Sequence, residues 1–212
     1  VDEVSRQNLE LVRSLRTGTR RGTLLSVLDH TCTAMGARLL ADWLRRPLRD
    51  AAAIEARLAA VAEGRERDSL RRELRERLKE VHDLERLGSR TVMGQAHGRD
   101  LVALKISLQA LPSIWATLAA MNAELYRPEE SIENLAALAD LIQRSIREDA
   151  PHTVLEGGLI KAGHHPELDE LVRISSDAKG YLAQLEVQEK ERTGITALKV
   201  SFNKVFGYYI EV

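Results

Sequence analysis

Residues 167–212 decide the expected architecture, and their sequence is ELDELVRISSDAKGYLAQLEVQEKERTGITALKVSFNKVFGYYIEV. In the first half, apolar or small residues recur three or four positions apart, which is the spacing of one helix face. These residues are Leu168, Leu171, Ser175, Ala178, Leu182 and Leu185. Only Gly180, which a helix tolerates, precedes the Thr193-Gly194 stop. The pattern predicts one uninterrupted helix over 166–194 that is stiff enough to act as a lever.

The last residues change the hydrophobic period from helical to alternating. Leu198, Val200 and Phe202 are expected on one face of a strand, and the residues between them on the other. NKVFG at 203–207 is a candidate turn or bulge before YYIEV, whose tyrosines we expect to pack. Two strands alone are marginally stable. We therefore expect 195–212 to be the first hairpin of a β-containing domain. We also expect the whole chain to be a segment of a longer protein, cut at both ends.

The residues before position 166 predict a helical core over 1–165. The expected short helix at 23–29 is followed by a helix that Thr33 caps and Pro47 stops. The next helix begins at the cap Asp50 and is expected to stop at Gly64. Further helices are expected near residues 68–81, 82–93 and 98–125, the last divided in two at Pro112, and from the cap Ser131 onward. The predicted fold class is mainly α.

Composition excludes several classes of protein. The 212 residues are 44% hydrophobic and 30% charged, and the formal net charge is −1, so no strong global field attracts nucleic acid or a membrane. The single cysteine, Cys32, excludes an internal disulfide and indicates a reducing compartment. No apolar run approaches the ~18 residues of a membrane span, and the start of the chain has no signal-peptide pattern.

Four blocks of sequence carry a resemblance to a known family. LDHTCTAMGARLLADWLRRPLRDAAAIEARLAAV at 28–61 resembles the core-domain signature of the MutS DNA mismatch-repair family. SRQNLEL at 5–11 resembles the family's opening core segment, with Gln7 in place of a usual Arg. GLIKAGHHPELDELVRI at 158–174 resembles its turn into a lever helix, and ERTGITALKVSFNKVFGYYIEV at 191–212 resembles the start of its clamp domain.

This resemblance implies a mechanical role on DNA. MutS proteins combine a mismatch-binding domain, a connector, a helical core with levers, a clamp inserted in the core, and an ATPase domain that binds ATP and Mg²⁺. They are homodimers that encircle double-stranded DNA, act with a MutL-type partner, and work in the bacterial cytoplasm at the nucleoid. The present chain would hold the core and the start of the clamp, and the lever would couple DNA binding to the ATPase domain.

The resemblance assigns candidate DNA-contacting residues to the hairpin. They are Lys199, Ser201, Asn203 and Lys204. Lysine supplies charge, and serine and asparagine supply hydrogen bonds, to phosphates rather than to bases. The same residues are equally compatible with a solvated strand face.

Other motifs point away from an active site in this chain. It contains no G-x-x-x-x-G-K-[ST] phosphate loop and no Phe-x-Glu mismatch wedge. The histidines and Cys32 lack metal-ligand spacing. We therefore predict no enzyme activity, cofactor or metal site for this segment itself.

Alternative interpretations remain open from the sequence. The basic run of Arg13, Arg16, Arg20 and Arg21 could contact DNA or another domain, although a solvated loop is favoured. The seam over 168–185 could instead make the chain a purely structural helical interaction or oligomerisation module without DNA binding of its own. An enzyme with an unrecognised site is the third interpretation.

Overall fold

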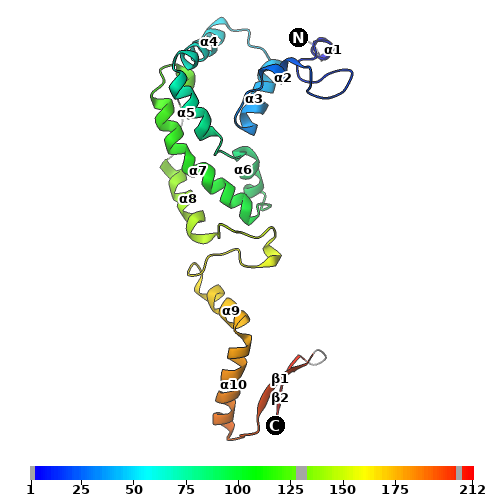
Figure 1. Ribbon diagram of the computed structural model, residues 1–212, viewed down its shortest axis with the longest axis vertical. Helices are drawn as coiled ribbons and strands as arrows, with labels where there is room; N and C mark the ends of the chain where they lie inside the picture. Colours follow the sequence, from blue (N-terminus) through cyan, green and yellow to red (C-terminus); the bar gives the residue numbers. More distant parts are fainter. Residues whose placement is uncertain (1–2, 128–132, 204–206) are drawn as a thin grey trace. The chain divides into compact units, whose positions relative to one another are not determined.

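The computed structural model describes residues 3–127, 133–203 and 207–212. The chain divides into two compact units, Val1–Ile160 and Lys161–Val212, and Figure 1 shows the elements of each. Helices dominate, and the sheet that the described residues form has two strands. The mainly α class is therefore confirmed. The division between the units falls a few residues before the predicted end of the helical core.

Helix α7, Gly98–Ala119, is the central helix of the first unit. It packs against α5 (Asp68–Leu78), α6 (Leu84–Val92) and α8 (Glu133–Ser145), which lie beside it in Figure 1. The predicted break at Pro112 is wrong, because α7 continues through this proline. Proline removes one helical hydrogen bond, and we attribute its tolerance to the packing of α7 against three helices.

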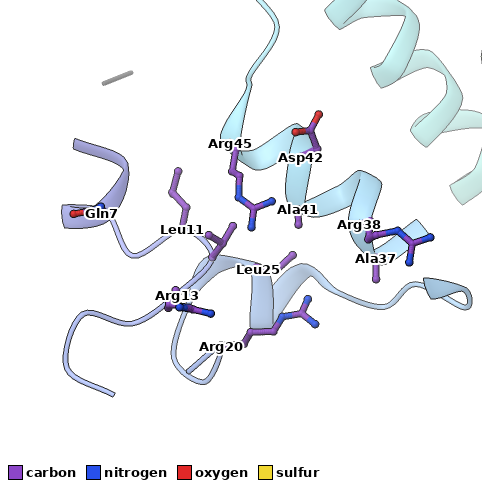
Figure 2. Close-up of a pocket in the computed structure, with 11 residues that line it drawn as sticks. Gln7, Leu11, Arg13, Arg20, Leu25, Ala37, Arg38, Ala41, Asp42 and Arg45 are labelled. Carbon is purple, nitrogen blue, oxygen red and sulfur yellow. The ribbon is translucent and has the colours of Figure 1, made fainter. Parts of the chain in front are cut away.

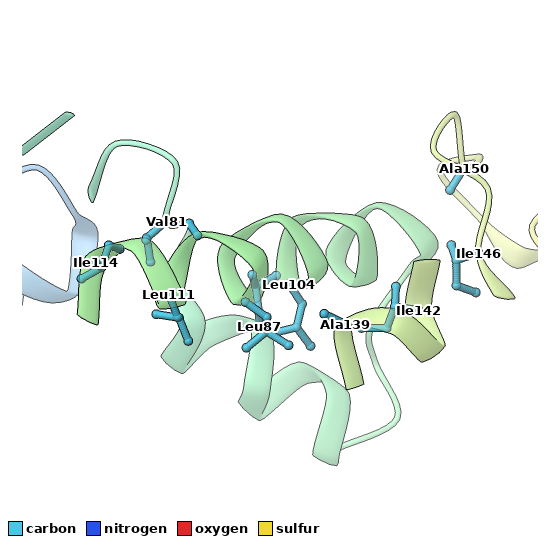
Figure 3. Close-up of a cluster of buried hydrophobic side chains, with 11 residues drawn as sticks. Val81, Leu87, Leu104, Leu111, Ile114, Ala139, Ile142, Ile146 and Ala150 are labelled. Carbon is cyan, nitrogen blue, oxygen red and sulfur yellow. The ribbon is translucent and has the colours of Figure 1, made fainter. Parts of the chain in front are cut away.

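The buried face of α7 builds the hydrophobic core shown in Figure 3. Leu104, Leu108 and Leu111 lie on this face at helical spacing and are buried. Leu87 of α6 meets them and is only 1% exposed. Ala139 and Ile142 add the contribution of α8 to the same cluster. Full burial of each large side chain stabilises the fold by about 1.5–3 kcal/mol.

The first helices of the unit are α1 (Glu3–Asn8), α2 (Leu24–Leu28) and α3 (Ala34–Arg45). Helix α2 confirms the short helix predicted at this place in the chain. Thr33 caps α3 as predicted, since its hydroxyl accepts the Gly36 N–H at 3.0 Å.

Helix α4, Ala51–Glu66, begins at the predicted cap, where the Asp50 carboxylate accepts a first-turn N–H at 2.8 Å. The predicted stop at Gly64 is wrong, because the helix passes through it. A Cβ atom at Gly64 would lie 2.7 Å from the hydroxyl oxygen of Tyr126. The glycine therefore permits a close helix-to-tyrosine contact instead of ending the helix.

Short irregular elements complete the first unit. They are the 3₁₀ turns η1 (Glu124–Tyr126) and η2 (Val154–Glu156), and an isolated bridge that pairs Ile146 with Ile160. The predicted cap Ser131 lies outside the described residues.

The second unit contains α9, Pro166–Ser176, and α10, Ala178–Thr193. The prediction of one uninterrupted helix over 166–194 is wrong at Asp177, whose backbone leaves the helical region (φ −111°, ψ 38°). Its carboxylate accepts the Gly180 N–H at 3.0 Å and caps α10. Short polar side chains compete in this way with helical backbone bonds, which explains the break.

An antiparallel hairpin ends the chain. Its strands are β1 (Lys199–Asn203) and β2 (Gly207–Glu211), and they confirm the change to a period of two. Part of the predicted turn, 204–206, lies outside the described residues.

Among the described residues, α7 is the one helix long and apolar enough to cross a membrane by length and composition. This finding differs from the expectation that no apolar run approaches the length of a membrane span. Since a face of α7 is buried against neighbouring helices of the same unit, we interpret it as a core helix.

Candidate nucleic-acid interface

The hairpin is anchored to the end of α10. Gly194 closes that helix in the left-handed region (φ 73°), and its N–H donates to the Lys190 carbonyl at 2.9 Å. Leu198 follows and is 3% exposed. The N–H of Val200 donates to the Glu186 carboxylate at 3.2 Å. The first strand is thus held to α10 by a hydrogen bond, and the residue before the strand is buried.

The register of the two strands fixes which side chains share a face. Directly opposed residues of an antiparallel pair point to the same side. The pairs are Lys199 with Glu211, Val200 with Ile210, Ser201 with Tyr209, Phe202 with Tyr208, and Asn203 with Gly207. One face therefore carries the polar β1 residues, and the other carries the apolar ones, as the alternation predicted.

Two of the four predicted contact residues, Lys199 and Ser201, occupy that polar face of the hairpin. Lys199 is exposed and Ser201 is half-buried. Asn203 ends β1 opposite Gly207. The fourth, Lys204, lies outside the described residues.

Two further residues share the polar face: Tyr209, which was expected to pack, and Glu211, which the sequence did not single out. Tyr209 lies opposite Ser201 and is 38% exposed, and Glu211 lies opposite Lys199. The turn could have revealed this arrangement, because a hairpin centred within NKVFG fixes which β1 residue lies opposite each β2 residue. Glu211 adds a negative charge beside the candidate lysine, so the face is less basic than the β1 sequence alone suggests.

The opposite face of the hairpin presents exposed aromatic rings. The rings of Phe202 and Tyr208 lie 4.9 Å apart between centroids, with a tilt of 54°. This contact agrees with the predicted packing of Tyr208, yet both residues remain 59% exposed. Ile210, which is also exposed, continues this apolar surface. The hairpin of this structure thus leaves one aromatic face open.

The carboxyl group that holds β1 is kept ionised by its neighbours. Lys190 donates to Glu186 at 2.6 Å, and this bond lowers the pKa of the Glu186 carboxyl. The bond from the Val200 N–H and the charge of Lys199 lower that pKa further. A negative charge at the base of the hairpin therefore orients the first strand at neutral pH.

The basic run of the first unit is exposed. Arg20 forms an ion pair of 2.7 Å with Asp29. The pKa of the Asp29 carboxyl is lowered, first by the hydroxyl of Thr31 and also by Arg20. The remaining members of the run are Arg13, Arg16 and Arg21.

Cys32 is a half-buried free thiol. Within 3–127, 133–203 and 207–212, no group of three or more His, Cys, Asp or Glu side chains is placed to hold a metal ion.

These features define the class of the chain: a helical scaffold domain that leads through two short helices to a β-hairpin. A family model described as MutS domain III matches residues 4–206. The chain belongs to this family, as the four sequence blocks predicted.

Relatives with curated names support the same assignment. The DNA mismatch repair protein MutS of Desulfatibacillum aliphaticivorans is 54% identical over 213 residues, which cover 100% of this chain and 24% of that protein. The MutS of Symbiobacterium thermophilum gives the same identity and coverages. The MutS of Myxococcus xanthus is 51% identical over 213 residues, again 100% of this chain and 24% of its own length.

The chain therefore spans about a quarter of the length of these relatives. The alternative interpretation as a purely structural oligomerisation module is not supported. Its predicted seam is also divided at Asp177, where α9 ends and α10 has not begun.

Proposed function

We propose that the hairpin contacts the phosphate backbone of double-stranded DNA through its polar face, without reading base sequence. Lys199 and Lys204 supply the charge, and Ser201 and Asn203 supply hydrogen bonds. Chemical groups of this kind position a protein on the duplex and carry no sequence information. Mismatch recognition and ATP hydrolysis belong, in this proposal, to other domains of a longer mismatch-repair protein.

The observation that carries the proposal is the strand register. It aligns Lys199 and Ser201 on one face, and Asn203 is the next alternate position of β1. Successive residues on one face of a strand are about 7 Å apart, which is about twice the 3.4 Å axial rise per phosphate of one DNA strand. A single extended strand is therefore suited to follow a phosphate backbone.

We further propose that α9 and α10 couple the DNA-bound hairpin to the helical core and, through it, to an ATPase domain that uses ATP and Mg²⁺. The whole protein would act as a homodimer around DNA, with a MutL-type partner, in the bacterial cytoplasm. Support comes from the family of the chain and from the two helices that connect the core to β1.

The first test is DNA binding by the protein extended until the hairpin's domain is complete. Fluorescence anisotropy with matched and mismatched duplexes is followed across a salt series. Lys199→Gln should weaken binding to both duplexes equally and reduce the salt slope by about 0.9, the value for one lost phosphate contact. The matched control is Arg173→Gln, which removes an exposed cation from α9 and should leave the slope unchanged.

Two outcomes would contradict this proposal. A loss of affinity for mismatched but not for matched duplex would place base readout at the hairpin. An unchanged salt slope in Lys199→Gln, with full binding by the extended protein, would show that the phosphate contacts lie elsewhere.

A further inference from the structure

A groove separate from the hairpin lies in the first unit, between α1 with the segment after it, helix α2 and helix α3. Its volume is about 800 Å³. Figure 2 shows most of its lining residues from these three elements. The volume is in the range of pockets that bind a ligand or a few side chains of a partner. Nothing in the proposed DNA contact uses this groove.

Four arginines and one aspartate supply the charge around the groove: Arg13, Arg20, Arg38, Arg45 and Asp42. Arg20 is paired with Asp29. Arg38 is paired with Asp83, the residue before α6, and with Glu85 of α6. Asp42 lies 3.5 Å from Arg46, and in Figure 2 its carboxylate points away from the groove. The groove therefore has a clear excess of positive charge.

Arg13 and Arg45 make no ion pair within the part of the chain that the structure describes. Both side chains belong to exposed residues, and in Figure 2 Arg45 extends from α3 toward the segment that holds Leu11. Arginine presents a planar fork of donors that matches carboxylates. Two unpaired guanidinium groups at one groove thus favour an occupant that carries carboxylates.

The floor of the groove is apolar. Leu11, Leu25 and Ala41 line it, and the last two are 3% and 8% exposed. Val12 and Ala37 complete this floor. A sugar-phosphate backbone would leave such a floor without a partner, whereas an apolar side chain would cover it. The best match is a peptide that anchors one apolar side chain between acidic residues.

We propose that this groove, named the α2–α3 groove, binds an acidic segment with an apolar anchor from another part of the same longer polypeptide. Relatives of the chain have about three quarters of their length outside the matched region, and a segment tethered in one polypeptide acts at high effective concentration. The proposal is independent of DNA contact by the hairpin.

The test is site-specific photo-crosslinking in the longer protein. Gln7 lines the groove and is exposed, so Gln7→p-benzoylphenylalanine places the probe there without removing a groove arginine. Mass spectrometry then identifies the linked peptide. We expect an intramolecular crosslink, independent of protein concentration, to a peptide that contains Asp or Glu on both sides of an apolar residue.

Charge reversal supplies the matched comparison. Arg13→Glu combined with Arg45→Glu should reduce the crosslink yield by at least about tenfold, because it replaces attraction with repulsion. Arg16→Glu combined with Arg21→Glu changes the same charge outside the groove and should leave the yield within about twofold. Unchanged circular dichroism and Tm of both double variants exclude a loss of fold.

Several results would overturn this inference. They are a crosslink to DNA, to a second copy or another protein, or to a peptide without carboxylates. The absence of any crosslink in a folded protein would also overturn it, as would an equal loss of yield in both double variants.

Discussion

Arg38 is the residue that fastens α3 to the start of α6. Its guanidinium donates two bonds of 2.7 Å to the Asp83 carboxylate and two, of 2.6 and 3.1 Å, to Glu85. Asp83 also accepts the Arg86 N–H at 3.2 Å and so caps α6. The Asp83 carboxylate thus links α3 to α6 and also caps the start of α6.

This geometry predicts a pH-dependent contribution to stability. The bond from Arg38, and to a lesser extent the backbone bond from Arg86, lower the pKa of the Asp83 carboxyl to about 2. The folded state therefore binds the proton less readily than the unfolded state, whose carboxyl titrates near 3.8. The stabilisation is complete above about pH 4 and is lost as the pH falls toward about 2.

Asp83→Asn should lower the free energy of unfolding by about 1–2 kcal/mol at pH 7, allowing for solvent screening at the half-exposed Arg38. Denaturant unfolding at several pH values measures this loss in the free energy of unfolding, which should become smaller below pH 4. Asp149→Asn is the control, because its pair with Arg147 is exposed and caps no helix. Equal deficits in the two variants would refute a special role for Asp83.

Gly64 shows how a single missing Cβ atom governs packing between distant segments. Tyr126 donates to the Ala60 carbonyl at 2.6 Å across Gly64, and a Cβ there would lie 2.7 Å from the tyrosine oxygen. Gly64→Ala should therefore cost about 1–2 kcal/mol of stability, despite the better helix propensity of alanine.

Gly88→Ala is the matched control, because Gly88 also lies in a helix but has nothing within 4 Å of an added Cβ. It should stabilise the chain by up to about 1 kcal/mol. Thermal or denaturant unfolding measures both variants. Stabilisation of Gly64→Ala to the same degree would contradict the contact with Tyr126.

At the scale of elements, the break at Asp177 determines which position a proline must occupy to interrupt α10 and so test it as a lever. Position 178 is the first residue of α10, where proline is tolerated, so Ala178→Pro should have little effect. Gln184→Pro falls inside α10 and should cost about 3 kcal/mol through a lost bond and a kink. Comparison of the two variants distinguishes the effect of a break inside α10 from the effect of a proline at the start of that helix.

In the longer protein, Gln184→Pro should weaken the control of ATP hydrolysis by DNA, while Ala178→Pro should preserve it. Steady-state ATPase rates with and without duplex DNA measure this effect. Full DNA stimulation in Gln184→Pro would exclude rigid transmission through α10.

At the scale of the whole molecule, buried contacts are unequally distributed between the two units. The core cluster surrounds α7 in the first unit, whereas Leu198 is the buried hydrophobic residue identified among the described residues of the second. Regions with few buried contacts open at low free-energy cost. The second unit should therefore be the less stable of the two when it is separated from the rest of its β-containing domain.

Native-state hydrogen exchange tests this distribution in the present chain. Amides of α7 between Leu104 and Ile114 should exchange slowest. Amides of β1 and β2 should exchange at least about 100-fold faster, which corresponds to about 3 kcal/mol of opening free energy. Hairpin amides as protected as those of α7 would show that two strands and α10 suffice for stable folding.

The sequence by itself determined the family, the mainly α class, the principal helix caps and the alternation of the hairpin. These features depend on neighbouring residues: Thr33 and Asp50 cap because their oxygens reach backbone N–H groups in the next turn. The period of two likewise placed Lys199, Ser201 and Asn203 together before any strand pairing was known.

Only the tertiary structure decided the remaining features, because they depend on residues far apart in the chain or on competition between hydrogen bonds. Packing carries α7 through Pro112, and Tyr126 explains Gly64 inside α4. At Asp177, a local cap prevails over a helical pattern that continues on both sides. Strand pairing placed Tyr209 and Glu211 beside the candidate site, and chain folding gathered the arginines of the α2–α3 groove. Local sequence patterns determine which secondary structure each segment favours, and long-range contacts decide whether the segment adopts it.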